Sequence, residues 1–174
     1  MSFQKSLLTA TLLAAASLTA VSNANAADAT GKFNVNITIT STCAVNAVLG
    51  TNDINFGTVI AGAAASAQSA TAFTVACSKG TPFVVNLTPS NNSKVGLGAM
   101  LGTGGSVPYQ LSKTAGGSAW GNEGTTTTEG NGFAGVGTGT ATPINHTVYA
   151  AVSAASTNVA PGTYTDLVAV KVTY

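Results

Sequence analysis

The sequence has 174 residues, a formal net charge of +1, and charged side chains at only 6% of its positions, compared with about 25% in an average soluble protein. All six of its cations are lysines, and they are scattered along the chain. Binding to nucleic acid or to an anionic membrane surface depends on clustered cations, so we expect neither function. The neutral, hydroxyl-rich composition gives little protection against self-association, which suits a subunit of a polymer.

The first 26 residues have the pattern of a secretory signal peptide. Lys5 precedes an apolar run from Leu7 to Val21, and Ala24 and Ala26 follow at the positions that a signal peptidase reads. The run is short for a membrane span, which needs about 20 apolar residues, and no cysteine beside it could carry a lipid. We therefore expect residues 1–26 to be removed near Ala26, which leaves an exported chain with the size of one domain.

Four large apolar side chains alternate with asparagine and threonine in the stretch GKFNVNITITSTC, residues 31–43. This period of two predicts a β-strand whose apolar face is made by Phe33, Val35, Ile37 and Ile39. Chain termini are usually loose, so a strand this regular near the start of the exported chain needs an explanation. The pattern alone is compatible with the first strand of a closed sandwich and with a strand that completes another molecule.

Cys43 and Cys77 are the only cysteines in the sequence. Disulfides form in the oxidising compartments to which a signal peptide leads, so we expect these two residues to be bonded. Closing a loop of this length stabilises a fold by about 4 kcal/mol in the chain-entropy model. The alternative, a metal or redox site, needs further ligands or a C-x-x-C spacing, and the sequence has neither.

Helix signals are almost absent after residue 26, and short apolar stretches between turn residues predict strands instead. The alanine-rich piece from Ala61 to Ala70 lacks large apolar residues at helical spacing, so we expect a loop there. Further predicted strands lie at Ile54–Val59, at Phe73–Cys77, at Phe83–Leu87, near Tyr109 and Leu111, at Ile144–Val152 and at Tyr164–Tyr174. About seven or eight short strands in a helix-poor chain predict an all-β fold of the β-sandwich type.

The stretch from Gly96 to Thr142 is rich in glycine, threonine, serine and alanine, with Trp120 and Phe133 as isolated aromatic residues. We expect long loops or irregular hairpins that belong to the same domain. A disordered linker is the alternative, and the two aromatic residues argue against it.

No constellation of residues points to catalysis. His146 is the only histidine, and without a nucleophile motif it is expected to be an exposed strand residue. Glu123 and Glu129 could form a glycosidase pair, but solvated charges are the expected state in a loop of glycine and threonine. The sequence has no metal-ligand spacing and no phosphate-binding loop, so we expect no enzyme activity, no cofactor and no small-molecule substrate.

The C-terminal stretch contains a second alternating strand, with Val168, Val170, Val172 and Tyr174 on one face. An apolar strand at the edge of a sheet invites pairing with another chain. The strand at residues 31–40 lies outside the loop that the cysteines close, so it is free to leave its own domain. If it docks beside the last strand of a neighbouring molecule, the apolar face of the N-terminal strand and the edge of the C-terminal strand are both covered, as in β-augmentation.

The sequence resembles the Spore Coat Protein U domain family, whose members include major subunits of archaic chaperone–usher pili. The resemblance is carried by the stretches GKFNVNITITSTC, INFGTV, FTVACSKGTPFVVNL and PGTYTDLVAVKVTY. It implies an immunoglobulin-like pilin sandwich at residues 43–174 that lacks one strand. It also implies an N-terminal donor strand, residues 27–42, that completes the fold of the next copy.

The resemblance assigns roles to individual positions. The residues that resemble the donor residues of the family are Phe33, Val35, Ile37 and Ile39. The residues that resemble the strand lining the acceptor groove and meeting the chaperone are Val168, Val170, Val172 and Tyr174. Cys43 and Cys77 resemble the disulfide that locks the family's fold.

The implied partners are identical subunits, a periplasmic chaperone and an outer-membrane usher, with the polymer on the cell surface in adhesion or biofilm formation. The length leaves no room for the second domain of a tip adhesin, so a stalk subunit is the expected type. Two alternatives remain: a secreted coat or matrix protein of the same domain, and a carbohydrate-binding module that stacks sugars on Trp120 and Tyr109.

Overall fold

The computed structural model describes residues 28–68 and 72–174, so the expected signal peptide and its cleavage site at Ala26 lie outside the described residues. A compact body extends to Tyr174, and its first strand begins at Cys43. Residues 28–42, called the N-terminal arm below, contain no strand, although the alternation at residues 31–40 predicts one. A strand exists only through pairing with a neighbour, and no segment of the described chain pairs with the arm.

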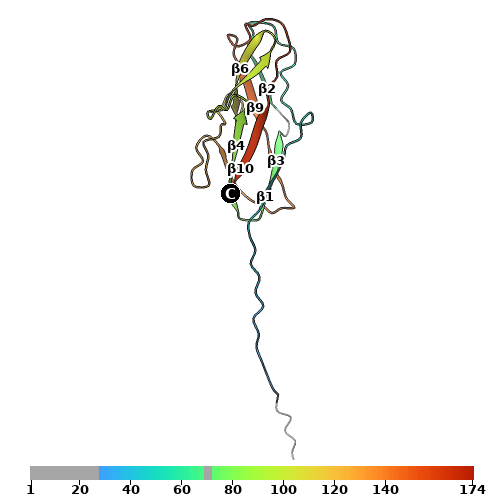
Figure 1. Ribbon diagram of the computed structural model, residues 1–174, viewed down its shortest axis with the longest axis vertical. Helices are drawn as coiled ribbons and strands as arrows, with labels where there is room; N and C mark the ends of the chain where they lie inside the picture. The colour runs from blue at the N-terminus through green and yellow to red at the C-terminus, as the bar shows by residue number, and fades with distance from the viewer. Residues whose placement is uncertain (1–27, 69–71) are drawn as a thin grey trace, which may run out of the picture. The chain divides into compact units, whose positions relative to one another are not determined.

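The body is all-β, and its strands form three antiparallel sheets of an immunoglobulin-like sandwich, as predicted (Figure 1). The first sheet has the order β1 (Cys43–Asn46), β3 (Phe73–Cys77), β8 (Ile144–His146). The second has the order β10 (Val168–Thr173), β4 (Pro82–Pro89), β7 (Phe133–Val136). The third has the order β2 (Ala65–Gln68), β9 (Tyr149–Val152), β6 (Gly105–Ser112), β5 (Leu97–Gly102). No helix of the described chain is long and apolar enough to cross a membrane.

The core lies where the alternating strands turn their apolar faces inward. In β3 every second residue is buried, and β4 and β6 supply further residues of the same core. The largest fully buried side chains are Trp120, Phe73, Phe83, Leu87 and Leu111. Because burial of one such aliphatic or aromatic side chain stabilises a fold by about 1.5–3 kcal/mol, these alternating stretches fix which residues become strands.

The predicted disulfide between Cys43 and Cys77 is confirmed. These residues are register partners in the antiparallel pairing of β1 with β3. The chain just before β1 is also held in place, because the Thr42 amide donates to Ser78 Oγ at 3.1 Å and the Ser78 amide donates to the Thr42 carbonyl at 2.9 Å. The point where the arm joins the body is therefore tied to β3 and to the residue that follows it.

Several strand predictions are wrong in detail. Residues 54–59 form no strand, although Ile54 and Phe56 are half-buried against the core. A strand, β2, lies in the piece from Ala61 to Ala70 that was expected to be a loop. The predicted strand Ile144–Val152 is two strands, β8 and β9, which belong to different sheets. The last strand begins at Val168 and not at Tyr164, because β10 pairs with β4 only from that residue on.

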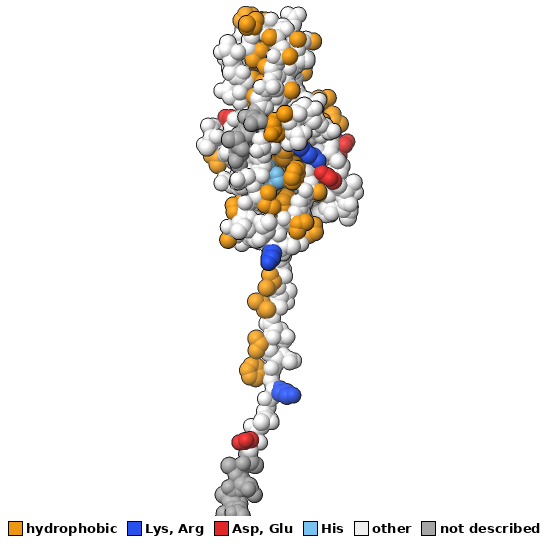
Figure 2. All heavy atoms as spheres, turned by 180° about the vertical axis from the view of Figure 1, so that it is seen from behind, with side chains coloured by type: hydrophobic (Ala, Val, Ile, Leu, Met, Phe, Trp, Pro, Cys, Tyr) orange, Lys and Arg blue, Asp and Glu red, His pale blue; other side chains and the backbone are white. Residues whose placement is uncertain are grey.

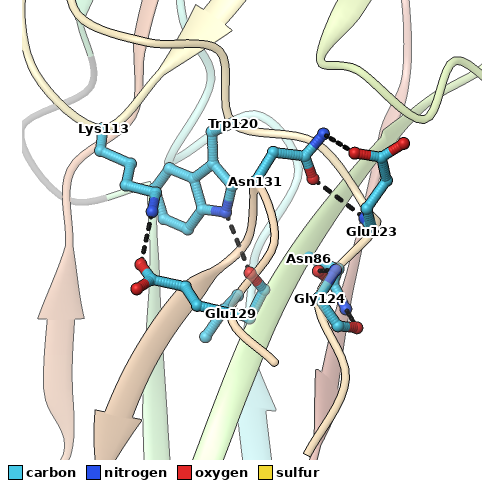
Figure 3. A network of polar contacts seen from close by, with 8 residues as sticks. Asn86, Lys113, Trp120, Glu123, Gly124, Glu129 and Asn131 are labelled. Atoms are coloured by element: carbon cyan, nitrogen blue, oxygen red, sulfur yellow. Dashed lines mark hydrogen bonds and ion pairs between the residues drawn. The ribbon is translucent and has the colours of Figure 1, made fainter. Parts of the chain in front are cut away.

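The stretch from Gly96 to Thr142 is an ordered part of the body, as predicted, and not a linker. It contains the β5–β6 hairpin and β7, and the loop between them lies against β4. Asn86 on β4 fixes this loop by donating to the Gly124 carbonyl at 2.8 Å and accepting from the Gly124 amide at 3.1 Å (Figure 3). The loop buries Asn86, which is 2% exposed, so β4 is covered on both faces.

Candidate functional site

The strand β10 ends its sheet and is paired on one edge only. Its register with β4 runs from Val168 opposite Pro89 to Thr173 opposite Val84. Within the part of the chain that the structure describes, no strand pairs with the other edge. Amide and carbonyl groups of alternate residues in an edge strand point away from the paired side. This edge can therefore accept a further strand.

The valines predicted to line an acceptor groove share the inward face of β10. Val168, Val170 and Val172 are half-buried and pack against the core, whereas Ala169 and Lys171 are exposed. Core valines such as Val75 and Val85, in contrast, are 0% exposed. The β10 valines thus retain apolar surface that no described residue of the body covers. Tyr174, the fourth predicted residue, follows the end of β10 and is 51% exposed.

A second edge strand borders the same opening of the sandwich. β1 is the first strand of its sheet, as β10 is of its own, and the two come within 8 Å of each other without forming a sheet together. Figure 1 shows β10 between β4 on one side and β3 with β1 on the other. We call this opening the β1–β10 seam. Since both of its borders are sheet edges, the seam has backbone groups on both sides that a further strand could pair with.

The predicted donor residues are exposed apolar side chains. Phe33, Val35, Ile37 and Ile39 have exposed fractions of 82–88%. Their spacing of two residues equals the spacing of the inward valines on β10. Burying each of these side chains would contribute about 1.5–3 kcal/mol. The arm therefore has the sequence pattern of a strand with one apolar face, but it pairs with no strand among the described residues.

His146 is buried, with 3% of its surface exposed, so the prediction of an exposed strand residue is wrong. Its ring stacks on Phe73 at 5.0 Å and meets the edge of Phe133 at 4.8 Å between centroids. Figure 2 shows hydrophobic atoms gathered around the histidine. Burial lowers the pKa of His146, and its Nε2 has no hydrogen-bond partner in the described structure. The residue is a neutral member of an aromatic cluster.

The acidic residues considered for catalysis have structural partners. Glu129 forms an ion pair with Lys113 at 2.6 Å, and this partner lowers the pKa of the Glu129 carboxyl. Glu123 Oε2 accepts a hydrogen bond from Asn131 Nδ2 at 3.1 Å (Figure 3). No group of three or more histidine, cysteine, aspartate or glutamate side chains in the described chain could hold a metal ion. These contacts brace the loop between β6 and β7.

The residues that a carbohydrate-binding module would need are inside the body. Trp120 is 1% exposed and Tyr109 is 6% exposed. Tyr109 Oη donates to the Asp166 carboxylate at 2.6 Å, and burial together with this contact raises the pKa of Tyr109. Neither ring has an exposed face for a sugar, so these two residues do not support the alternative of a carbohydrate-binding module.

Sequence reasoning found β10 and the arm but missed two features. Asn86, which fixes the loop over β4, gave no signal beyond one polar residue in a buried strand. Residues 54–59 were predicted to form a strand because their apolar and polar residues alternate. The structure has no strand there, and alternation in the sequence does not reveal that a segment lacks a strand to pair with.

The model of the Spore Coat Protein U domain matches residues 29–171, which include the apolar part of the arm, the disulfide and most of β10. No curated protein matches the chain.

Proposed function

Because the chain belongs to the Spore Coat Protein U domain family, which includes chaperone–usher pilus subunits, we propose that it is a structural subunit of a surface pilus that polymerises by donor-strand exchange. The observation that carries this proposal is the edge of β10. Its backbone is unpaired on one side, and its inward valines keep uncovered apolar surface beside that side. The arm supplies four exposed apolar residues at the spacing that this edge requires.

In the proposed polymer, the arm of one subunit lies along β10 of the next. Its backbone extends the sheet by hydrogen bonds, which contribute about 1 kcal/mol each. Its apolar side chains enter the β1–β10 seam and cover Val168, Val170 and Val172. The interaction is β-augmentation, in which the main chain supplies affinity and the side-chain pockets supply the choice of partner.

Two further partners follow from this proposal. A subunit with an uncovered seam would aggregate before assembly, since exposed apolar sheet edges pair unselectively. A periplasmic chaperone therefore occupies the seam with a strand of its own after export, and an outer-membrane usher replaces that strand with the arm of another subunit. The polymer reaches the cell surface, where it supports adhesion or biofilm formation.

Deleting residues 27–40 tests the proposal directly. The shortened protein should fold and still bind the chaperone through β10, but it should form no fibres in electron micrographs. On a denaturing gel without heating, the complete protein should give a ladder that collapses to monomer on boiling. Fibres from the shortened protein would overturn the proposal.

The identity of the neighbouring genes would distinguish a pilus subunit from a coat or matrix protein of the same family. A pilus subunit requires a chaperone and an usher, which are commonly made together with it. Deletion of the usher gene should remove the ladder from the cell surface while the subunit remains in the periplasm. Surface polymers in the absence of any usher would favour the coat protein.

A further inference from the structure

The hydrogen bonds between β10 and β4 begin one residue after the start of β10. Leu87, the residue before Thr88 in β4, donates its amide to the Gly121 carbonyl at 3.0 Å and so does not donate to β10. Backbone groups of an antiparallel strand face the same partner at every second residue. The first bonded pair is therefore Thr88 with Ala169. The backbone groups of Val168 face the free edge of β10.

The chain just before Ala169 has few backbone hydrogen bonds. Thr165 is bonded to Leu101 on β5, because its amide donates at 3.0 Å and its carbonyl accepts at 2.8 Å. Among the described residues, no backbone group is hydrogen-bonded to the backbone of Asp166 or Leu167. Segments with few bonded backbone groups open locally at low cost. The start of β10 therefore depends on an attachment by side chains.

The carboxylate of Asp166 provides this attachment. Its Oδ2 accepts a hydrogen bond from Tyr109 Oη at 2.6 Å, and its Oδ1 accepts from Ser90 Oγ and from the Leu167 amide, the latter at 2.8 Å. Tyr109 lies on β6 in the third sheet, whereas Ser90 follows β4 in the second sheet. The carboxylate thus joins two sheets at the point where the chain passes from β5 to β4.

The hydroxyl of Tyr109 reaches Asp166 because β5 has a glycine at the facing position. Gly98 is the register partner of Tyr109, and a Cβ atom on Gly98 would lie 2.0 Å from Tyr109 Cζ. The ring therefore lies directly over the backbone of β5, which separates β6 from Thr165. Tyr109 is only 6% exposed, and a buried hydroxyl that loses its partner is unfavourable. This hydrogen bond consequently fixes the position of Asp166.

We propose that Asp166 is a positioning residue for donor-strand exchange. Its carboxylate holds the chain before β10, so that the free backbone groups and the inward side chain of Val168 stay in line with the rest of the strand. The occupant of this edge is the arm of a second copy, so the inference rests on the proposed function. Ordering a frayed start of β10 on binding would cost conformational entropy, which Asp166 removes in advance. Asp166 acts through β10 and does not contact the arm.

Binding of a fluorescent peptide tests the inference. The probe has the sequence of residues 31–40 and is added to dilute exported protein, with binding followed by anisotropy. Asp166→Ala should weaken binding about tenfold with an unchanged circular dichroism spectrum, because the start of β10 must then be ordered on binding. Asp166→Asn, whose side-chain oxygen still accepts from Tyr109, should restore the affinity to within about threefold of the unmodified protein.

Glu129→Ala is the matched control. It removes a carboxylate that is ion-paired with Lys113 in the loop over β4, and it should change the affinity less than about twofold. Equal binding by Asp166→Ala and the unmodified protein would overturn this inference and leave the proposed function standing. No binding of the peptide to the unmodified protein would overturn both.

A double-mutant cycle locates the effect along β10. Val168→Ala should weaken peptide binding clearly in the unmodified protein and much less in Asp166→Ala, because the start of β10 then contributes little. Val172→Ala, near the other end of the strand, should weaken binding by the same factor in both proteins. Such non-additivity is expected of groups that act together. Equal factors for Val168→Ala in both proteins would mean that Asp166 only stabilises the body, and would overturn the positioning role.

Tyr109→Phe provides the same test if Asp166→Ala does not fold. The phenylalanine ring can still lie over Gly98, and only the hydroxyl that holds Asp166 is lost. We expect binding about threefold weaker, with the same loss of sensitivity to Val168→Ala. A Tyr109→Phe protein that binds the peptide as tightly as the unmodified protein would overturn the inference.

Discussion

The indole Nε1 of Trp120 donates a hydrogen bond to the carbonyl oxygen of Val85, at 3.0 Å, inside the body (Figure 3). This bond joins the loop after β6 to the middle of β4, the strand with which β10 pairs. The ring of Trp120 also contacts Phe73 and Phe133, with centroids 5.9 and 5.6 Å away. One side chain thus connects the loop, the central strand and the aromatic cluster.

Replacing Trp120 should therefore destabilise the body even though no ligand touches it. Trp120→Phe keeps most of the ring contacts but removes the donor to Val85, and we expect the free energy of unfolding to fall by about 1–3 kcal/mol. Trp120→Ala also leaves a cavity and should cost about 3–5 kcal/mol. Urea unfolding followed by circular dichroism measures both values. Equal stability of Trp120→Phe and the unmodified protein would contradict a role for the hydrogen bond.

The disulfide should contribute strongly to stability. The protein with Cys43→Ser and Cys77→Ser should lose about 4 kcal/mol of unfolding free energy, because its unfolded chain gains the entropy of an open loop. Cys43 and Cys77 are 34 residues apart. Thermal unfolding of the variant and of the unmodified protein, with and without reductant, measures the difference. Reductant should lower the melting temperature of the unmodified protein only, and an equal effect on the variant would point to another cause.

Stability should decrease at mildly acid pH because of His146. Its pKa is lowered by burial in the folded protein, whereas the unfolded chain has a pKa of about 6.5. Below that value the unfolded state takes up a proton that the folded state does not bind, so the free energy of unfolding falls until the pH reaches the lowered pKa. Unfolding titrations between pH 8 and pH 5 measure this slope. His146→Phe, which suits the aromatic surroundings, should reduce it, and an unchanged slope would assign the effect to the carboxylates.

A charge on the apolar face of the arm should stop assembly without affecting the fold. Ile37→Asp would place a carboxylate in the apolar seam of the neighbour, where burial of an unpaired charge is strongly unfavourable. Asn36→Asp adds the same charge to the opposite face of the arm and is the matched control. Electron microscopy and gel ladders should show fibres for Asn36→Asp only, with equal melting temperatures for both monomers. Fibres of normal length from Ile37→Asp would argue against the assigned donor face.

The sequence predicted the strands that carry large apolar residues at a period of two. Phe73–Cys77 and the core of β4 were found because burial of alternate side chains determines their position. β2 was missed because its inward residues are alanines, which give almost no periodic signal. The segment 53–59 has the periodic signal but no partner, and pairing depends on residues far away in the chain.

The residues of the candidate site were predicted only in part, because the sequence shows alternation within a strand but not which strands pair. The inward valines of β10 are visible as an alternating pattern, but only the sheet order shows that one edge of the strand is free. His146 was expected at the surface because its sequence neighbours are Asn145 and Thr147. Its burial is caused by Phe73 and Phe133, which approach it from other strands. Local sequence does not contain that information.

The disulfide at the start of β1 also determines how the body responds to mechanical force. Tension on residues 31–42 reaches Cys43 before any other residue of β1, and the covalent bond passes it to Cys77 in the central strand of the first sheet. β1 cannot be peeled away one hydrogen bond at a time, and the residues between the two cysteines cannot lengthen while the bond is intact. A chain pulled by its arm therefore carries the load through a strand that is hydrogen-bonded on both sides.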